Sequence, residues 1–330
     1  MRDDRISISL AADHRYLQGL LATMSSMILS ASRKELLLFH VFADGLSQED
    51  CEQVETVARR MGVSSGQIEF HHPDMSRIKA LFTPYNGSYA AFLRLFLCEF
   101  LSEDWTLYTD VDTLWFRDVC SLWKERDNAV SVLWCKDLPS IARGVKEYSR
   151  EYCPDLDVNR YACSGVMLMN LARMRTNDFV SQCARFAERW GTPLFVDQDI
   201  LNVICLKDAK LLDQVWDCLS PTRAAIDGCV LHFNGIGRMF NGPMKGWRVL
   251  YYAWYRYYYD IVEGNPCRSV CPWFKRVFFW MAGSLYPSKP LMRILFSRLG
   301  DQAPDNFERY FFFAWLFRRA KWWRKWSVST

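Results

Sequence analysis

The order of apolar and helical patterns in roughly the first seventy residues constrains the fold of this chain more than any other feature. Apolar runs at Ile6–Ala12, Leu36–Ala43 and Gln67–His71 predict three strands. Between them, residues 17–31 and 47–61 carry apolar side chains at helical spacing, and the second helix starts with a serine that can cap it. Strands that alternate with helices form parallel sheets with right-handed crossovers. The sequence therefore predicts an α/β fold with a mixed, mainly parallel sheet flanked by helices.

The same alternation continues to about residue 250. We predict a helix at 88–101, strands at 130–134 and 165–170, a helix within 172–190, and an apolar run at 230–235 that ends in a histidine and a glycine. Arg94 is a charge inside an apolar helix, and the local pattern leaves open a snorkelling arginine on an exposed face. The chain has no Gly-x-Gly-x-x-Gly after its first strand and no P-loop pattern, which argues against dinucleotide binding and P-loop chemistry.

An apolar run at 107–109 ends in two carboxylates, Asp110 and Asp112, separated by Val111. In an extended chain the two carboxylates would point the same way, about 6.6 Å apart, with Val111 on the other face. Two acids on one face at a strand end repel each other unless a cation lies between them, and hard oxygen ligands suit Mg²⁺ or Mn²⁺. The alternative is a solvated acidic turn. Ligands of open α/β sheets bind beyond the carboxyl ends of strands, where we also expect Asp13.

The chain is 330 residues long, with a net charge of +4 and twelve cysteines, none in a Cys-x-x-Cys pair. We expect the cysteines to be mostly small buried residues, and we expect no secretory leader, which predicts a cytoplasmic protein. Residues 267–330 hold twelve Lys or Arg and three Asp or Glu, a net of 12 − 3 = +9, interleaved with tryptophans. Such a basic, aromatic tail predicts contact with an anionic surface.

Asp13, Arg94, the Asp110/Asp112 pair, residues 197–202 and the segment 232–247 occur in an order that is specific when taken together. This set resembles the retaining glycosyltransferases of family eight, which include bacterial enzymes that extend the lipopolysaccharide outer core. The resemblance covers about residues 5–250 and implies a GT-A type catalytic domain at 1–250. Residues 251–330 would form a helical C-terminal region that contacts the membrane or the acceptor.

The resemblance also implies a metal centre. Asp110, Asp112 and His232 would bind Mn²⁺ or Mg²⁺, and the ion would hold the diphosphate of a UDP-sugar and stabilise the charge that grows on it during transfer. Taken alone, a histidine such as His232 is more often a hydrogen-bonded core residue than a metal ligand. Lys245 would place a second positive charge on the phosphates. The family usually has a shorter spacing to this lysine and Lys-Pro-Trp, so Arg238 is an alternative.

Other residues are expected to bind the donor. The resemblance places Ala11, Asp13 and Arg15 at uracil and ribose, although Asp13 is as well explained as a helix cap. Arg94, Asp197 and Gln198 would hold the sugar, with Asp199 structural. The complete set of expected UDP-sugar contacts is Ala11, Asp13, Arg15, Arg94, Asp110, Val111, Asp112, Cys163, Ser164, Asp197, Gln198, Gly235 and Lys245. Cys163 stands where the family often has an asparagine.

Gln198 occupies the position where a covalent mechanism would need a nucleophile, and an amide is a poor one. We therefore expect front-face transfer of glucose or galactose to a glycan acceptor, lipopolysaccharide core or another membrane glycolipid, with Gln198 and Asp197 as catalytic residues. The protein would lie on the inner face of the bacterial cytoplasmic membrane, without a nucleic-acid partner. Two alternatives remain at this stage: a protein that binds a UDP-sugar without transferring it, and a membrane-associated structural protein.

Overall fold

The computed structural model describes residues 5–151, 153–154, 156–219 and 228–232. These residues belong to a compact unit that comprises Met1–Leu219 and Gly228–Asn234. The predicted domain boundary at residue 250 and the basic tail lie outside the described residues, so both stay predictions. Within the described part, no helix combines the length and the apolar character that a membrane crossing needs.

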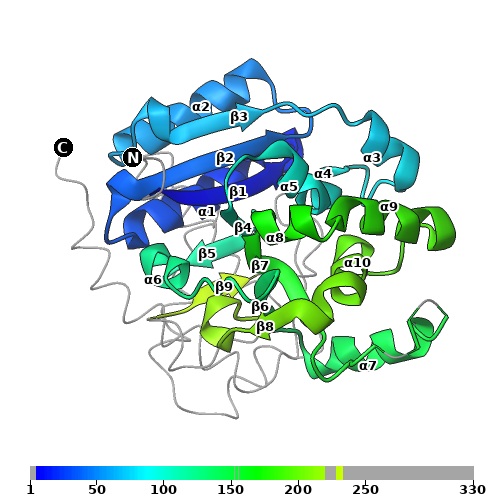
Figure 1. Ribbon diagram of the computed structural model, residues 1–330. Helices are drawn as coiled ribbons and strands as arrows, with labels where there is room; N and C mark the ends of the chain where they lie inside the picture. Colours follow the sequence, from blue (N-terminus) through cyan, green and yellow to red (C-terminus); the bar gives the residue numbers. More distant parts are fainter. Residues whose placement is uncertain (1–4, 152, 155, 220–227, 233–330) are drawn as a thin grey trace, which may run out of the picture. The chain divides into compact units, whose positions relative to one another are not determined.

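A seven-stranded sheet in the order β3-β2-β1-β4-β7-β6-β8 forms the centre of the described unit (Figure 1). Its strands are β1 (Ile6–Ala12), β2 (Leu37–Ala43), β3 (Ile68–His71), β4 (Trp105–Thr109), β6 (Val132–Lys136), β7 (Ala162–Asn170) and β8 (Ala209–Leu211). Only β7 runs antiparallel to its neighbours, β4 and β6, and every other pairing in this sheet is parallel. The predicted mixed, mainly parallel sheet is therefore confirmed. A separate antiparallel pair joins β5 (Thr113–Trp115) and β9 (Val230–His232).

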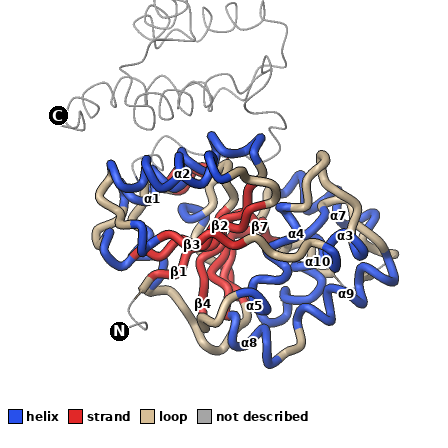
Figure 2. The backbone as a smooth tube through the Cα atoms, turned by 90° about the horizontal axis from the view of Figure 1, so that it is seen from above, coloured by secondary structure: helices blue, strands red, loops and turns tan. Residues whose placement is uncertain are grey.

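Helices cover both sides of the strands (Figure 2). They are α1 (Leu17–Ser30), α2 (Gln48–Arg60), α3 (Ser76–Leu81), α4 (Ala90–Leu93), α5 (Leu97–Phe100), α6 (Val119–Trp123), α7 (Pro139–Tyr148), α8 (Leu171–Thr176), α9 (Phe179–Trp190) and α10 (Val196–Cys205). Figure 2 shows α1 and α2 on one side of the strands and α5, α8, α9 and α10 on the other. On that second side, Phe42, Tyr108 and Met167 of the sheet pack into one apolar core with the helices.

The early elements lie close to where the sequence places them, because each has a strong local signal. Ser47 caps α2 and forms a capping box with Asp50, as its position predicted. The predicted helix at 88–101 is interrupted: a 3-10 turn, Arg94–Phe96, separates α4 from α5. Arg94 therefore sits at an irregular point of the chain, where such turns often mark functional positions.

Candidate functional site

Asp110 and Asp112 lie in the short connection between β4 and β5, beyond the carboxyl end of β4. The connection is a turn, so the extended conformation expected for these residues is wrong. The Thr113 hydroxyl donates to the Asp110 carbonyl oxygen at 2.9 Å and helps to hold the turn. Val111 is buried and faces away from water, which leaves the two carboxylates to be placed by the turn rather than by strand pleating.

His232 reaches the two carboxylates because β9 pairs with β5, with Thr113 opposite His232. Its Nε2 lies 3.2 Å from Asp112 Oδ1 and 3.8 Å from Asp110 Oδ2. Ligand atoms at about 2.1 Å from one octahedral ion lie about 3 Å apart when they are adjacent. The structure thus brings the three predicted ligand residues to separations that suit a single divalent cation, and their ligand atoms all lie within 4.8 Å of one another.

Gly165 on β7 makes the approach of His232 possible. A Cβ atom at position 165 would lie only 2.0 Å from Cε1 of the His232 ring, closer than atoms can pack. The Gly165 carbonyl oxygen also accepts a 2.8 Å hydrogen bond from the backbone N–H of Asp110. Gly165 therefore holds the Asp110 backbone and leaves room for the His232 imidazole. Any larger residue at this position would displace Asp110 or His232.

Asp217 completes the surroundings of His232, and the sequence did not identify it. Its side chain is fully buried, and its Oδ1 lies 2.8 Å from His232 Nδ1. A carboxylate on the second ring nitrogen is a frequent feature of metal-binding histidines, since it orients the ring and leaves Nε2 for the ion. Cys163 also lies here, with its sulfur 3.7 Å from the same Nδ1. Asp217 follows a 3-10 turn and gives no local signal of function.

Arg94 is the buried cation of the site, only 5% exposed. Its guanidinium lies 2.6 Å from Asp110 Oδ1 and 3.1 Å from Asp197 Oδ2, and it donates to the Ser164 carbonyl oxygen at 2.8 Å. The guanidinium also lies over the Tyr108 ring, 4.4 Å from its centroid. The alternative of an exposed, snorkelling arginine is therefore wrong, because Arg94 ties Asp110 to the helix that carries Asp197.

The first turn of α10 contains Asp197, Gln198 and Asp199. All three side chains are buried, and each has different hydrogen-bond partners. Ser164 donates its hydroxyl to Asp197 Oδ2 at 3.1 Å and its backbone N–H to Gln198 Oε1 at 3.1 Å. The amide nitrogen of Gln198 donates to Asp137 Oδ2 at 2.8 Å, which fixes the orientation of the amide. Asp199 instead accepts from the Tyr161 hydroxyl at 2.6 Å, away from the metal ligands.

The buried charged groups of the site shift one another's pKa values. Burial raises the pKa of Asp197 to about 6, even though Arg94 favours its ionised form. Burial also raises the pKa of Asp110. For Asp112 burial acts in the same direction, but His232 outweighs it and holds the pKa below its ordinary value. Burial lowers the pKa of His232, but Asp217 and Asp112 outweigh it and hold the pKa well above its ordinary value.

Asp13 lies beyond the carboxyl end of β1, as predicted, and it caps the 3-10 turn that follows. Its Oδ1 accepts from the Tyr16 backbone N–H at 3.2 Å, and its Oδ2 accepts from the Arg15 guanidinium at 2.6 Å. Arg15 also donates to the Asn86 carbonyl oxygen at 2.7 Å. The helix-cap role that the sequence left open is thus present, and Arg15 holds the carboxylate in place. Ala11 is buried within β1.

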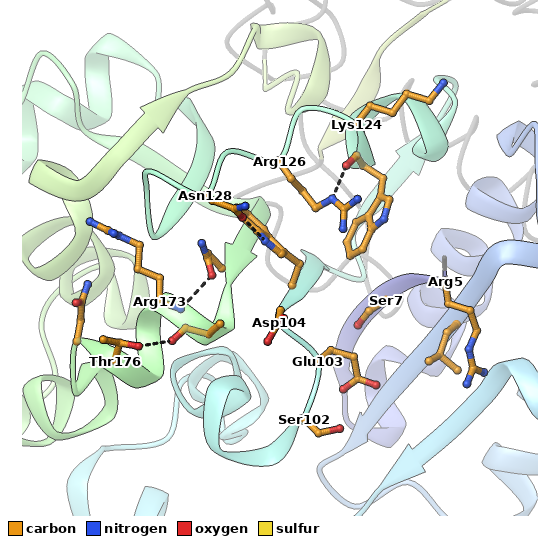
Figure 3. Close-up of a pocket in the computed structure, with 16 residues that line it drawn as sticks. Arg5, Ser7, Ser102, Glu103, Asp104, Lys124, Arg126, Asn128, Arg173 and Thr176 are labelled. Carbon is orange, nitrogen blue, oxygen red and sulfur yellow. Dashed lines mark hydrogen bonds between the residues drawn. The ribbon is translucent and has the colours of Figure 1, made fainter. Parts of the chain in front are cut away.

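Three predicted residues are not described, and one cavity lies away from the site. Gly235, Arg238 and Lys245 lie outside the described residues. A cavity of about 1000 Å³ opens at the other end of the sheet, lined among others by Ser7, Asp104 and Arg173 (Figure 3). These residues flank the amino ends of β1 and β4 and the end of β7, so the cavity does not belong to the Asp110 cluster.

The donor set fits a hard divalent cation. Among the described residues, four carboxylates share the region with the guanidinium of Arg94 and the imidazole of His232; they belong to Asp110, Asp112, Asp197 and Asp217. The buried Asp217 Oδ2 has no hydrogen-bond partner, and the buried Asp112 Oδ1 faces only His232 Nε2, 3.2 Å away and without hydrogen-bond geometry. Since an unpartnered buried carboxylate oxygen is costly, the excess negative charge favours a bound cation.

Comparisons with known proteins match this chain to one family. The model of the family described as Glycosyl transferase family 8 matches residues 7–250. The chain is 26% identical over 265 residues to the lipopolysaccharide 1,3-galactosyltransferase of Salmonella typhimurium. This alignment covers 74% of this chain and 73% of that protein. It is 24% identical over 298 residues to the lipopolysaccharide 1,2-glucosyltransferase of Escherichia coli, with 81% and 80% covered. It spans about half the length of some other curated relatives.

Among solved structures, the galactosyltransferase LgtC in complex with donor and acceptor sugar analogs has a TM-score of 0.63 at 20% identity, over 82% of this chain and 99% of that chain. At that identity the likeness shows the fold, and the expected GT-A type architecture is confirmed. The family match begins within β1 and includes every element that carries Asp110, Asp112, Asp197 and His232. The chain therefore belongs to glycosyltransferase family 8.

Proposed function

We propose that this glycosyltransferase moves a hexose, glucose or galactose, from a UDP-sugar to a glycan acceptor of the lipopolysaccharide core or another membrane glycolipid, with retention of anomeric configuration. The observation that carries the proposal is the convergence of Asp110, Asp112 and His232, from segments far apart in the chain, on one point beyond β4. The donor and acceptor classes rest on relatives whose names include lipopolysaccharide galactosyl- and glucosyltransferases.

The three residues of that point would hold Mn²⁺ or Mg²⁺. When bound, the ion would neutralise the diphosphate and stabilise the negative charge that develops on it as the sugar leaves. Asp217 would keep His232 Nε2 directed at the ion by accepting from Nδ1. Arg94 would fix Asp110 in its ligating position and balance part of the charge of the acidic residues around it.

The sugar would lie between the metal ligands and the start of α10. Asp197 is oriented by Arg94 and Ser164 and would accept hydrogen bonds from sugar hydroxyls. Gln198, whose amide is fixed by Ser164 and Asp137, would face the anomeric carbon and stabilise its positive charge. An amide held in this way suits electrostatic stabilisation better than nucleophilic attack.

Retention then follows from attack on the face that the leaving group occupies. The bond between the anomeric carbon and the phosphate oxygen breaks, and the acceptor hydroxyl oxygen forms the new bond on the same side. The proton of the acceptor hydroxyl passes to the departing phosphate oxygen, so the chain needs no separate general base. The basic tail at 267–330 would hold the enzyme near an anionic membrane that carries the acceptor.

The test is transfer from UDP-glucose and UDP-galactose to a lipopolysaccharide core acceptor in the presence of Mn²⁺, followed by product mass and anomeric configuration. We expect a product with one added hexose and retained configuration, and loss of that product in Asp112→Asn. Asp104→Asn is a matched control, because Asp104 is exposed just before β4, at the strand end opposite to Asp110. Equal UDP release by all three proteins would refute the assignment.

A further inference from the structure

A second histidine cluster lies on the edge strands of the sheet, apart from the transferase residues. In the parallel pairing of β2 with β3, His40 stands opposite Glu69, and Phe42 stands opposite His71. Side chains two residues apart on a strand share a face, so His40, Glu69 and His71 lie on the same face of the sheet. The Phe42 ring stacks on His71 at a centroid distance of 4.7 Å and limits the motion of that imidazole.

The ligand atoms of this cluster have the separations of a tetrahedral metal site. His40 Nδ1 lies 3.0 Å from His71 Nε2 and 3.4 Å from Glu69 Oε2, and the third separation, from His71 Nε2 to Glu69 Oε2, is 4.0 Å. Zinc binds imidazole nitrogen and carboxylate oxygen at about 2.0–2.2 Å, which places tetrahedral ligands about 3.3–3.5 Å apart. The observed values bracket that range, so small side-chain rotations would suffice.

The other nitrogen of His40 points to a ligating role. His40 is 1% exposed, and its buried Nε2 has no hydrogen-bond partner. The nearest carboxylate oxygen is Oε1 of Glu103, 3.6 Å from Nε2. This is the arrangement of a metal-binding histidine whose second nitrogen faces a carboxylate, as His232 faces Asp217 in the transferase cluster. Glu103 precedes β4 and lines the solvent-open cavity at that end of the sheet (Figure 3).

The outer side of the cluster is open to solvent, since the side chains of Glu69 and His71 are 46% and 26% exposed. An ion can therefore enter, and a water molecule can occupy a fourth position. Without a metal, the 3.0 Å contact between the two rings is a simple hydrogen bond.

We propose that His40, Glu69 and His71 form a second metal site, which binds Zn²⁺ with Glu103 orienting His40 from behind. The site would join the edge strand β3 to β2 and, through Glu103, to the segment before β4. Two imidazoles and one carboxylate are a donor set that suits zinc better than Mg²⁺ or Mn²⁺. The proposal does not depend on the transferase activity, because none of its residues contacts the Asp110 cluster within the described part of the chain.

The experiment is Zn²⁺ binding to the full-length purified protein, followed by metal content and by the visible spectrum of the Co²⁺-substituted form. His71→Ala is expected to lose one bound ion and the tetrahedral Co²⁺ bands. His72→Ala is the matched control, because His72 is an exposed neighbour outside the cluster, and it should keep both. Zn²⁺ bound by the transferase residues or by cysteines is the same in both variants, so it does not contribute to the difference in zinc content between them.

Two further variants keep the test decisive if His71→Ala folds poorly. Glu69→Gln changes a half-exposed side chain and should also lose the ion, while Glu103→Gln should keep the ion with an affinity about 10–100-fold weaker. Zn²⁺ should raise the melting temperature of the wild type and of His72→Ala, and not that of Glu69→Gln. Equal zinc content and identical Co²⁺ spectra in the wild type, His71→Ala and Glu69→Gln would overturn the proposal and leave only the hydrogen-bonded histidine pair.

Discussion

The cluster around His232 and the cluster around His40 hold similar ligand atoms in different surroundings. Around His232, the carboxylates of Asp110 and Asp112 come from one turn and that of Asp217 from a second segment, and a buried arginine balances part of their charge. Around His40, two imidazoles and one half-exposed carboxylate come from two paired strands. The first cluster lies beyond the carboxyl end of β4, and the second lies within the edge of the sheet.

This difference indicates what each cluster can bind. Excess buried carboxylate requires a cation, and hard oxygen donors with positions to spare favour an ion that also accepts phosphate oxygens. An imidazole-rich set with little excess charge favours zinc and needs no anionic ligand. The location matters as well, because only the first cluster lies at the end of the sheet where α/β proteins bind their ligands.

The largest expected effect is on catalysis. Replacing Asp110 and Asp112 together by alanine should lower the transfer rate by about 10³-fold or more, since the charge on the leaving diphosphate loses its stabilisation. His71→Ala should stay within about twofold of the wild type if catalysis depends on the first cluster alone. Steady-state transfer at saturating Mn²⁺ measures both. A folded His71→Ala protein as inactive as the double variant would break the distinction between the clusters.

The next effect is on stability, at the buried cation that balances the first cluster. Arg94→Ala should reduce the free energy of unfolding by about 3 kcal/mol, because Asp110 and Asp197 lose their buried partner. The value lies at the lower end for buried pairs, since the Asp110 side chain is 24% exposed. Arg77→Ala is the control: Arg77 pairs with Glu99 at 2.9 Å on the surface, where such pairs contribute about 1 kcal/mol or less. Urea unfolding compares them, and equal losses would contradict the role of burial.

The third effect is on metal affinity, through the carboxylate of Asp217 beside His232 and that of Glu103 beside His40. Asp217→Asn should weaken Mn²⁺ binding by about 10–100-fold without changing Zn²⁺ binding at His40, because Asp217 orients only His232. Glu103→Gln should do the opposite. Titration calorimetry with each ion on both variants gives the four affinities. If Asp217→Asn weakened both sites to the same degree, the two clusters would not be independent.

The sequence predicted the parts of this molecule that have local signals. The strands β1, β2 and β3 and the capped helix α2 follow from apolar spacing and from Ser47 with Asp50. The two acids of the first cluster were visible because they follow an apolar strand. These strands, the helix cap and the acid pair depend on residues close together in the chain, so they can be predicted from one sequence.

Contacts made by tertiary register were not predictable in the same way. Asp217 meets His232 only because Cys218 bridges to Leu231 of β9, and β9 in turn pairs with β5. His40 and His71 meet because β2 and β3 pair in one particular register, and a shift by one residue would put them on opposite faces. The buried position of Arg94 likewise depends on Asp197, which the chain brings back from a distant helix.

The smallest expected effect is a pH dependence at the start of α10. Burial raises the pKa of Asp197 to about 6, whereas an aspartate in the unfolded chain titrates near its ordinary value. Because the folded state holds this proton more tightly, the stabilisation that it gives is complete at low pH and is lost as the pH rises through about 6. Asp197→Asn, which cannot ionise, should lack this loss.

The wild type should therefore lose about 1.5 kcal/mol relative to Asp197→Asn between pH 5 and pH 7.5, measured by urea unfolding at a series of pH values. The sign distinguishes two physical situations. If the ion pair with Arg94 dominated over burial, the folded pKa would lie below the unfolded one. The wild type would then gain stability over the variant only as the pH rises through the acid range up to about 4, and the difference would be flat between pH 5 and pH 7.5. A difference that is flat over the acid range as well would mean that the two effects cancel. Only the first outcome agrees with a site whose buried negative charge exceeds what Arg94 can balance, which is the property on which our proposal of a bound cation at the first cluster depends.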